Sequence, residues 1–444
     1  MVYNWVRLVS TFQIRSPHLT AHIPVAQKNR VARKDLVYKK MAEDLNGRTS
    51  GDADEKLRSL HLLSIDEDEL DDNGHADSYD DEDDEEKVPI ALGFVEKKKN
   101  SWSLLRQFFP SKAGGTPAWL DPVNLPSGRY CVCDFCGEPL QFMLQVYAPL
   151  TETDSTFHRT LFVFMCQSMA CLLQDQHEQW KRHPELALRS VKAFRCQMSR
   201  LNSFYSSEPP EKDGTARPSG DGAALCSWCG TWRGDKVCSG CKTVRYCSEK
   251  HQAVHWRSGH KKQCFSNISL SESSCAVANL PKVASKSLWP EYEISSEDEF
   301  YDISNDLPHS TSLVSTSQLD ETFNSLLDAF EGDEDKKSWA SFQERISCAP
   351  EQVMRYCRYP KAKPLWPMSS GQPSNSDIPR CSYCSGPRVF EFQILPQLLY
   401  YFNVGNDAHS LDWATMVVYT CEASCGGSGA YKEEFVWVQV PSQS

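Results

Sequence analysis

The chain has 444 residues, 19 of them cysteine, and a formal net charge of −12 at pH 7. This length allows two or three domains with real cores, and no apolar run is long enough to cross a membrane. Many cysteines without a secretory signal indicate a soluble intracellular protein whose thiols bind metal. The acidic balance favours a basic partner and argues against direct nucleic-acid binding.

Residues 1–40 form a basic extension, with eight Lys or Arg residues and a single acidic residue, Asp35. That composition also suits an organelle transit peptide, although a clear amphipathic repeat is missing. We interpret the extension as lying upstream of a chain whose usual start is Met41. The transit peptide is the alternative.

Residues 41–87 are predicted to be an acidic disordered segment. From Asp66 to Glu86, 14 of 21 residues are Asp or Glu, so too little apolar surface is available for folding. The apolar residues just before this run have the spacing of a leucine-rich nuclear export signal, which docks in a receptor groove. They are Leu57, Leu60, Leu63 and Ile65. The alternative is an amphipathic helix that no receptor binds.

Ordered structure is predicted from residue 88, and residues 88–205 are expected to be the first half of a β-rich scaffold. A strand comes first, followed by a basic amphipathic turn of helix over 102–109. A Gly-Gly-Thr-Pro turn then presents Trp119, which we interpret as a core anchor. A further helix is expected over 172–183.

The stretch 226–264 is a predicted zinc finger, because it places eight soft-metal ligands in four close pairs. A structural zinc ion takes four thiolate or imidazole ligands, so eight ligands indicate two ions. The alternating order of the pairs suggests a cross-brace, although spacing fixes the number of sites better than the pairing. One ion would then be held by Cys226, Cys229, Cys247 and His251, and the other by Cys238, Cys241, His260 and Cys264. His255 is interpreted as a bystander on the helix.

Residues 265–330 are rich in Ser, Asp and Glu and are predicted to be an acidic disordered linker. Order is expected to resume near 338. Spaced apolar residues over 338–358 indicate a broken helical pattern, in which Pro350 begins a second helix.

An internal repeat relates 88–205 to a second half, 338–441. In each copy a Cys-x-x-Cys pair is followed by Pro, Phe and Gln three, six and nine residues after its second cysteine, and an apolar strand then leads to a second cysteine pair. We expect each copy to hold one more zinc ion, and the alternative is buried free thiols. The sets are Cys133, Cys136, Cys166 and Cys171, and Cys381, Cys384, Cys421 and Cys425.

The predicted fold class is therefore α+β. It is a β-rich, zinc-stapled scaffold of two related halves, with an inserted zinc finger and disordered acidic segments. Because the copies flank the finger, we expect them to pack into one discontinuous domain.

The finger resembles the MYND-type zinc fingers through Tyr246-Cys247, Gln252, Trp256, His260 and Cys264, with His251 where most members carry Cys. The whole arrangement resembles a plant-like member of the programmed cell death protein 2 family. The matching segments are 112–122, 133–141, 226–264, 350–356 and 381–397. This resemblance implies a nucleocytoplasmic protein of ribosome biogenesis. Such a protein escorts a newly made small-subunit ribosomal protein, in eukaryotes the one numbered two.

The expected function is accordingly a dedicated chaperone in the cytoplasm and nucleus. The alternative is a nuclear scaffold whose finger recruits proline-rich partners in transcriptional regulation or in cell-death and proliferation control. An enzyme is less favoured, because a zinc ion with four protein ligands has no open position for water. A phosphate loop, a nucleophile elbow and a cofactor fingerprint are also missing from the sequence.

Overall fold

The computed structural model describes residues 89–100, 102–182, 187–217, 220–268, 283–299, 334–405, 407, 409–426 and 429–441. The predicted basic extension, the acidic segment and the export pattern at Leu57 to Ile65 lie outside these residues. None of the helices in the described ranges has both the length and the apolar character needed to cross a membrane.

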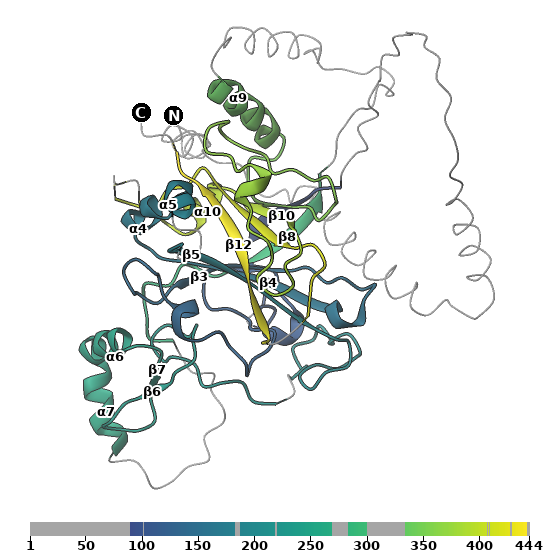
Figure 1. The fold of residues 1–444 in the computed structure, drawn as a ribbon. Coiled ribbons are helices and arrows are strands. Elements are labelled where there is room, and N and C mark those ends of the chain that lie inside the picture. The colour runs from purple at the N-terminus through teal and green to yellow at the C-terminus, as the bar shows by residue number, and fades with distance from the viewer. Residues whose placement is uncertain are drawn as a thin grey trace, which may run out of the picture. The chain divides into compact units, whose positions relative to one another are not determined.

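Ten strands of the described residues form one closed, antiparallel barrel (Figure 1). Their order around the barrel is β1-β8-β2-β3-β4-β5-β12-β11-β10-β9, and β9 pairs again with β1. The strands are β1 (Ala91–Glu96), β2 (Lys112–Ala113), β3 (Gln141–Tyr147), β4 (His158–Met165), β5 (Val191–Met198), β8 (Tyr292–Asp298), β9 (Gln352–Tyr356), β10 (Arg388–Ile394), β11 (Thr415–Cys421) and β12 (Tyr431–Gln439).

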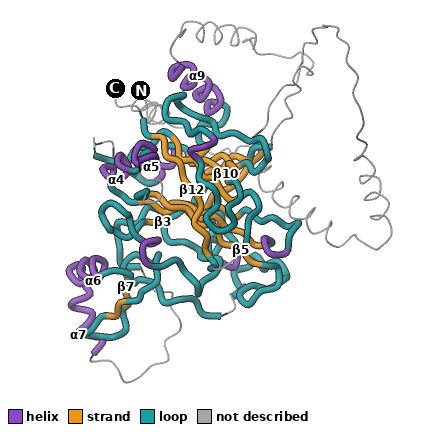
Figure 2. The backbone as a smooth tube through the Cα atoms, in the orientation of Figure 1, coloured by secondary structure: helices purple, strands orange, loops and turns teal. Residues whose placement is uncertain are grey.

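Helices in the described residues are short and connect these strands. They are α4 (Met169–Gln174), α5 (His177–Arg182), α6 (Glu249–His255), η4 (Trp256–His260), α7 (Lys261–Ile268), α9 (Glu334–Ser347) and α10 (Gln397–Tyr401). Single turns are η1 (Arg106–Phe108), η2 (Gly128–Cys131), η3 (Asp154–Thr156) and η5 (Asn375–Asp377). Figure 2 shows the barrel strands gathered in one group, apart from the small hairpin of β6 (Lys236–Val237) and β7 (Arg245–Tyr246).

The central strands β3 and β4 are almost entirely buried, on both of their faces. Every residue of β4 is buried. Side chains alternate along a strand, so Leu161 and Val163 contribute to the barrel core while Phe162 and Phe164 contribute to a second core. A strand covered on both faces loses the alternation of polar and apolar residues, and this explains the continuous run LFVFM.

Residues before and after the finger share the barrel, which is the discontinuous domain that the sequence predicts. Strand β5 of the first half pairs with β12 of the second, through Cys196 opposite Tyr431 and Ala193 opposite Glu434. Strand β1 pairs with β9 in the same way. The two halves therefore fold as one sheet with one main core.

The predicted disordered linker over 265–330 is wrong for the part that the structure describes. Residues up to 268 belong to α7, and β8 pairs with both β1 and β2. Only Ile294 and Ser295 of β8 are buried, while most of its acidic side chains are exposed or half-exposed. The acidic composition of 265–330 as a whole predicts disorder, but it does not reveal that the short segment β8 is a strand that completes the barrel.

The helix expected to begin at Pro350 is also wrong. Helix α9 covers the first part of the pattern, but Gln352–Tyr356 is strand β9. Gln352, Val353, Met354 and Arg355 are consecutive and all buried, which a strand between two sheet neighbours permits. The helix expected over 102–109 is reduced to η1, and the one over 172–183 is divided into parts of α4 and α5.

The finger packs on the barrel through a shared aromatic core. The finger contains the hairpin of β6 (Lys236–Val237) and β7 (Arg245–Tyr246), followed by α6, η4 and α7. Trp232 of the finger donates its indole N–H to the Leu140 carbonyl at 2.8 Å, and Trp119 donates its indole N–H to the Thr231 carbonyl at 2.8 Å. Trp119 is only 4% exposed, which confirms it as a core anchor.

Candidate metal centres

The first cluster of the finger joins a turn, a strand end and a helix. Cys226 and Cys229 lie on a turn, Cys247 follows β7, and His251 lies in the first turn of α6. The backbone N–H of His251 donates to Ser248 Oγ at 3.1 Å, so the helix cap fixes the histidine. Its Nδ1 lies 3.6 Å from Cys226 Sγ and 3.1 Å from Cys247 Sγ. All four ligand atoms lie within 4.8 Å of one another.

The second cluster gathers Cys238, Cys241, His260 and Cys264 within the same limit. Cys238 Sγ lies 3.8 Å from Cys264 Sγ and 3.4 Å from His260 Nε2. The structure thus brings the first ligand pair together with the third, and the second with the fourth, which is the predicted cross-brace. His255 lies outside both clusters, and its Nδ1 is 3.1 Å from the Tyr246 hydroxyl.

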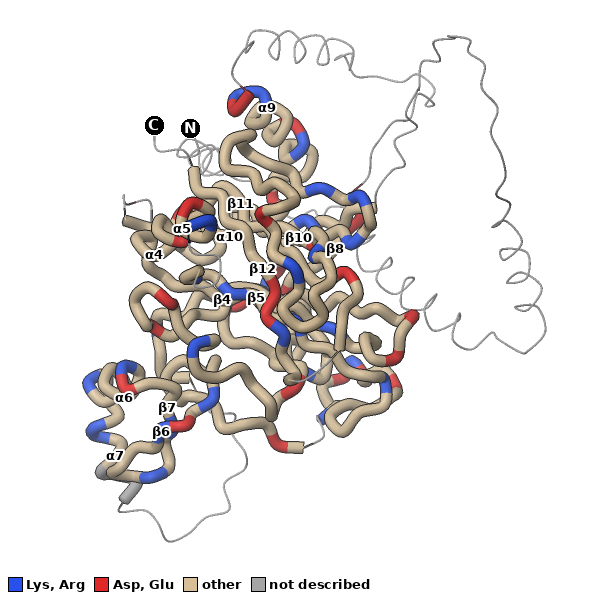
Figure 3. The backbone as a smooth tube through the Cα atoms, viewed as in Figure 1, with Lys and Arg blue, Asp and Glu red and all other residues tan. Residues whose placement is uncertain are grey.

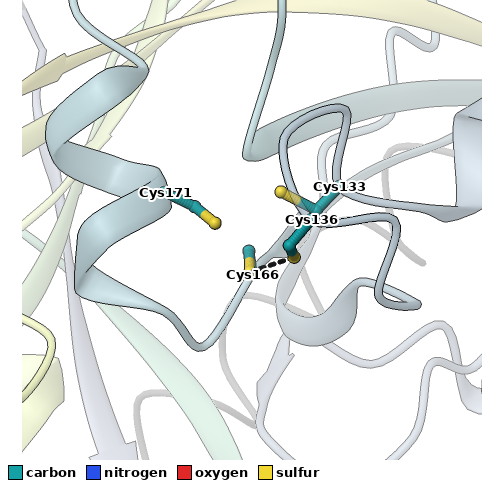
Figure 4. A group of neighbouring side chains, drawn as sticks. All are labelled: Cys133, Cys136, Cys166 and Cys171. Atoms are coloured by element: carbon teal, nitrogen blue, oxygen red, sulfur yellow. Dashed lines mark hydrogen bonds between the residues drawn. The ribbon is translucent and has the colours of Figure 1, made fainter.

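Two further clusters lie at the ends of barrel strands, one in each half. Cys133, Cys136, Cys166 and Cys171 form the first, with their sulfur atoms directed toward a common centre (Figure 4). Cys136 Sγ is 3.6 Å from Cys166 Sγ. In the second cluster Cys381 Sγ is 3.7 Å from Cys425 Sγ, and Cys384 Sγ is 3.6 Å from Cys421 Sγ.

Four turns of the same geometry carry the Cys-x-x-Cys pairs of these clusters. In each, the residue after the second cysteine donates its backbone N–H to the carbonyl of the first cysteine, at 2.7 to 2.9 Å. That residue has a positive φ, between 54° and 66°, in every case. The four are Gly137, Gly230, Lys242 and Ser385. One backbone conformation therefore presents two thiols at all four sites, even where the residue is not glycine.

The sulfur–sulfur distances within the clusters fit a zinc ion with tetrahedral coordination. A Zn–S bond of about 2.3 Å places two sulfur ligands of a tetrahedron about 3.8 Å apart, and the sulfur pairs of the clusters lie 3.6 to 3.9 Å apart. Four protein ligands also complete the coordination of each ion. Zinc bound here would hold chain segments together and would leave no position for a reacting water.

Hydrogen bonds between the thiols favour one thiolate in a cluster even before an ion binds. The hydrogen bond from Cys166 lowers the pKa of Cys133 to about 5. Hydrogen bonds from Cys229 and Cys247 likewise lower the pKa of Cys226. Thiolates are the form that binds zinc, and the pKa of the other thiols, such as Cys166 and Cys247, is raised, so binding of an ion would release protons from them.

Buried charges around the barrel clusters are the functional residues that sequence reasoning missed. Arg195 donates Nε to Glu434 Oε1 at 2.7 Å and Nη1 to the Cys425 carbonyl at 3.1 Å, so the first half supports the cluster of the second. Lys192 Nζ donates to Asp134 Oδ1 at 2.8 Å, beside Cys133. Charged residues inside apolar strands, as in VKAFRCQ, were the available signal.

A groove of about 550 Å³ lies outside the metal clusters, where α9 meets β9 and β10. Arg345 of α9 and Arg355 of β9 both line it, and both form ion pairs with Glu299. Phe390 and Leu365 provide apolar surface. The groove therefore lies between helix α9 and the strands of the second half of the barrel.

Four zinc-type clusters around a closed β barrel, two of them in a finger packed on it, define a zinc-stapled β scaffold. Three family profiles match the chain: "Programmed cell death protein 2, N-terminal domain" over residues 89–212, "MYND finger" over 226–264, and "Programmed cell death protein 2, C-terminal putative domain" over 336–440. The chain belongs to the programmed cell death protein 2 family and carries a MYND zinc finger.

Relatives of known sequence agree with this assignment. Programmed cell death protein 2 of Bos taurus is 36% identical over 364 residues, covering 79% of this chain and 96% of the relative. Programmed cell death protein 2-like of Homo sapiens is 29% identical over 338 residues, covering 71% and 85%. "Probable 20S rRNA accumulation protein 4" of Schizosaccharomyces pombe is 31% identical over 102 residues, covering 20% and 24%. No solved structure matches the chain.

Proposed function

We propose that the protein is a dedicated escort of a newly made small-subunit ribosomal protein, the one numbered two in eukaryotes. The observation that carries the proposal is the similarity to a relative whose name refers to accumulation of 20S rRNA. A net charge of −12, with 14 acidic residues between Asp66 and Glu86, suits a strongly basic client. Acidic flanks would compete with RNA for the client until it reaches its place in the subunit.

A binding role, and not an enzymatic one, is in keeping with the metal centres. Each cluster offers four side chains to an ion, so an ion bound there is fully coordinated by protein. In this proposal zinc stabilises the scaffold, and recognition is left to the surfaces around it.

Recognition of the client would use side chains and grooves. Among the described residues each barrel strand has a neighbour on both sides, so no strand is left as a free edge along its whole length for a client strand to join. The groove between α9, β9 and β10 is the candidate surface, since Phe390 and Leu365 offer apolar contact there. Its charged lining is mainly basic, so in this proposal the attraction for a basic client comes from the acidic segments of the chain. This proposal includes the identity of the client and the surface that binds it. It also includes a location in both cytoplasm and nucleus and recognition of Leu57 to Ile65 by an export receptor.

Depletion of the protein from cells tests the escort role. Loss of the escort should lower free small subunits relative to large ones in sucrose-gradient profiles, because the client would aggregate before assembly. Re-expression of the intact chain should restore the ratio, and a chain carrying Cys381→Ser should not. An unchanged ratio after full depletion would contradict the proposal.

We also infer that the two halves of the barrel are copies of one unit. Gln145 accepts from the Ala118 N–H at 2.8 Å and donates to the Pro110 carbonyl at 2.9 Å. Gln393, its counterpart in the repeat, accepts from Leu365 N–H at 2.7 Å and donates to the Leu365 carbonyl at 2.9 Å. Ala118 and Leu365 each stand between a proline and a tryptophan.

Strand irregularities support the same inference. The register of β3 against β4 shifts between Phe142 and Leu144, and that of β10 against β11 shifts between Phe390 and Phe392. Both shifts fall six to eight residues after the second cysteine of the local Cys-x-x-Cys pair. A bulge retained at one repeat position is expected when both copies inherit one strand geometry.

A second candidate function is a scaffold whose finger recruits proline-rich partners. It is favoured by one comparison: "Ubiquitin carboxyl-terminal hydrolase 17" of Arabidopsis thaliana is 54% identical over 41 residues, which is 5% of that relative. A module shared between otherwise different proteins suits a common docking role. Affinity purification with mass spectrometry separates the candidates, since one predicts ribosomal proteins and the other predicts transcriptional regulators.

A further inference from the structure

The finger carries a charge opposite to that of the whole chain. Residues 226–264 contain eight Lys or Arg residues against two acidic residues, a difference of +6, whereas the side chains of the whole chain sum to −12. Six thiolate ligands and two zinc ions would together lower the charge of the loaded finger to about +4. All eight basic residues are exposed: Arg233, Lys236, Lys242, Arg245, Lys250, Arg257, Lys261 and Lys262. Figure 3 shows blue segments outnumbering red ones along β6, β7, α6 and α7. The finger is therefore a local positive surface.

Half of these cations are not neutralised by a described neighbour. Arg233, Lys236 and Lys250 form ion pairs with Asp235, Glu249 and Glu138, respectively. Lys242, Arg245, Arg257 and Lys261 form no ion pair with any residue in the described ranges. We call these four residues the unpaired finger cations.

Metal ligands adjoin two of the unpaired finger cations. Lys242 directly follows Cys241, and Lys261 directly follows His260, so both adjoin ligands of the second finger cluster. Arg257 Nε donates to the Ala253 carbonyl at 3.2 Å, which ties its side chain to the helix. Cations on a fixed framework lose less conformational freedom when they bind an anion than cations on a mobile chain do.

Two tryptophan rings accompany these charges on the finger. Trp228 and Trp256 are half-buried, and their rings lie 5.7 Å and 5.9 Å from those of His255 and His260, respectively. Unpaired bases stack on aromatic side chains, while Lys and Arg contact the phosphates between them. Acidic peptides would use the charges but would have less use for the part of each ring that the core leaves uncovered.

We propose that the finger binds single-stranded RNA, with Lys242, Arg245, Arg257 and Lys261 on the phosphates and Trp228 and Trp256 beside the bases. The net charge of the chain argues against nucleic-acid contact only as an average, and the unpaired finger cations are a local exception to it. This inference does not depend on the escort role, because it concerns another surface and another ligand.

Fluorescence anisotropy tests it with the full, zinc-loaded chain and a labelled uridine oligonucleotide of about 20 nucleotides. Arg257→Glu with Lys261→Glu should weaken binding about tenfold. It should also lower the slope of log affinity against log salt by about 1.4, or about 0.7 for each phosphate that the variant no longer neutralises. Lys97→Glu with Lys361→Glu is the matched control, since it makes the same charge change at exposed residues outside the finger and should change neither quantity. Zinc content and thermal unfolding establish that the variants are folded.

Three results would overturn the proposal. One is an absence of binding at micromolar concentrations in low salt, and another is an equal loss of affinity in both double variants. The third is equal competition by polyglutamate or polyphosphate at matched charge, which would assign the surface to acidic protein or to anions in general. Failure of the escort role would appear in the subunit ratio and would leave these RNA measurements unchanged.

Discussion

Arg159 of β4 and Glu391 of β10 form a two-point ion pair between strands that are not neighbours in the barrel. Arg159 Nη2 donates to Glu391 Oε2 at 2.7 Å, and both side chains are fully buried. Glu391 also accepts from the Tyr356 hydroxyl and from Arg358 Nη1, each at 3.0 Å. The pair therefore connects the two halves of the barrel, 232 residues apart in sequence.

Replacing Glu391 by glutamine should destabilise the protein by about 3–5 kcal/mol, because Arg159 would be left as an uncompensated buried charge. Denaturant unfolding of the zinc-loaded protein measures the change in free energy. Glu422→Gln is the matched control, because Glu422 is exposed, and it should change stability by less than about 0.5 kcal/mol. Similar losses in both variants would show that the ion pair has no special role.

The loss of folding stability caused by Glu391→Gln should become smaller as the pH falls. Burial alone would raise the pKa of Glu391, but the charge and hydrogen bonds of Arg159 and its neighbours lower it to about 2. A folded pKa below the unfolded one gives stability at higher pH that is lost on acidification. The stability difference between wild type and variant should thus be constant above about pH 5 and should shrink toward pH 2. A difference that grows on acidification would contradict this assignment.

Sequence reasoning predicted the finger well because its ligands lie in one short stretch, where spacing alone constrains the geometry. It predicted the four cysteine sets and Trp119 from local patterns in the same way. It missed β8, because Ile294 is surrounded by acidic residues that resemble a linker. It could not predict Arg159–Glu391 or barrel closure, since both depend on contacts between segments far apart in the chain.

Elemental analysis should find four zinc ions per chain. Cys384→Ser should lower the count to three, because three ligands hold zinc much less tightly than four. Cys348→Ser is the control, since Cys348 is an exposed cysteine outside the four clusters, and it should retain four ions. A wild-type count of two would limit zinc to the finger.

Finger and barrel should unfold together. Trp232 is 1% exposed and belongs to a core that also contains Phe162 and Phe164 of β4. Trp232→Ala should therefore cost about 3–5 kcal/mol of stability in the barrel itself, as large-to-small changes in a core do. Near-ultraviolet circular dichroism and hydrogen exchange in β4 measure this effect. Val254→Ala, at an exposed position of the finger, provides the comparison. Unchanged protection of β4 would show that the finger is an independent module.

Binding of the purified protein to the free small-subunit ribosomal protein, without RNA, tests the escort proposal most directly. We expect a stable complex that weakens but persists when salt shortens the Debye length from about 8 Å to about 3 Å. Deletion of Asp66 to Glu86 should slow association more than it speeds dissociation, since long-range attraction acts mainly on encounter. Cys133→Ser or Cys381→Ser should abolish the complex by unfolding the scaffold. Failure of the two intact, purified proteins to associate even at low salt would contradict the account.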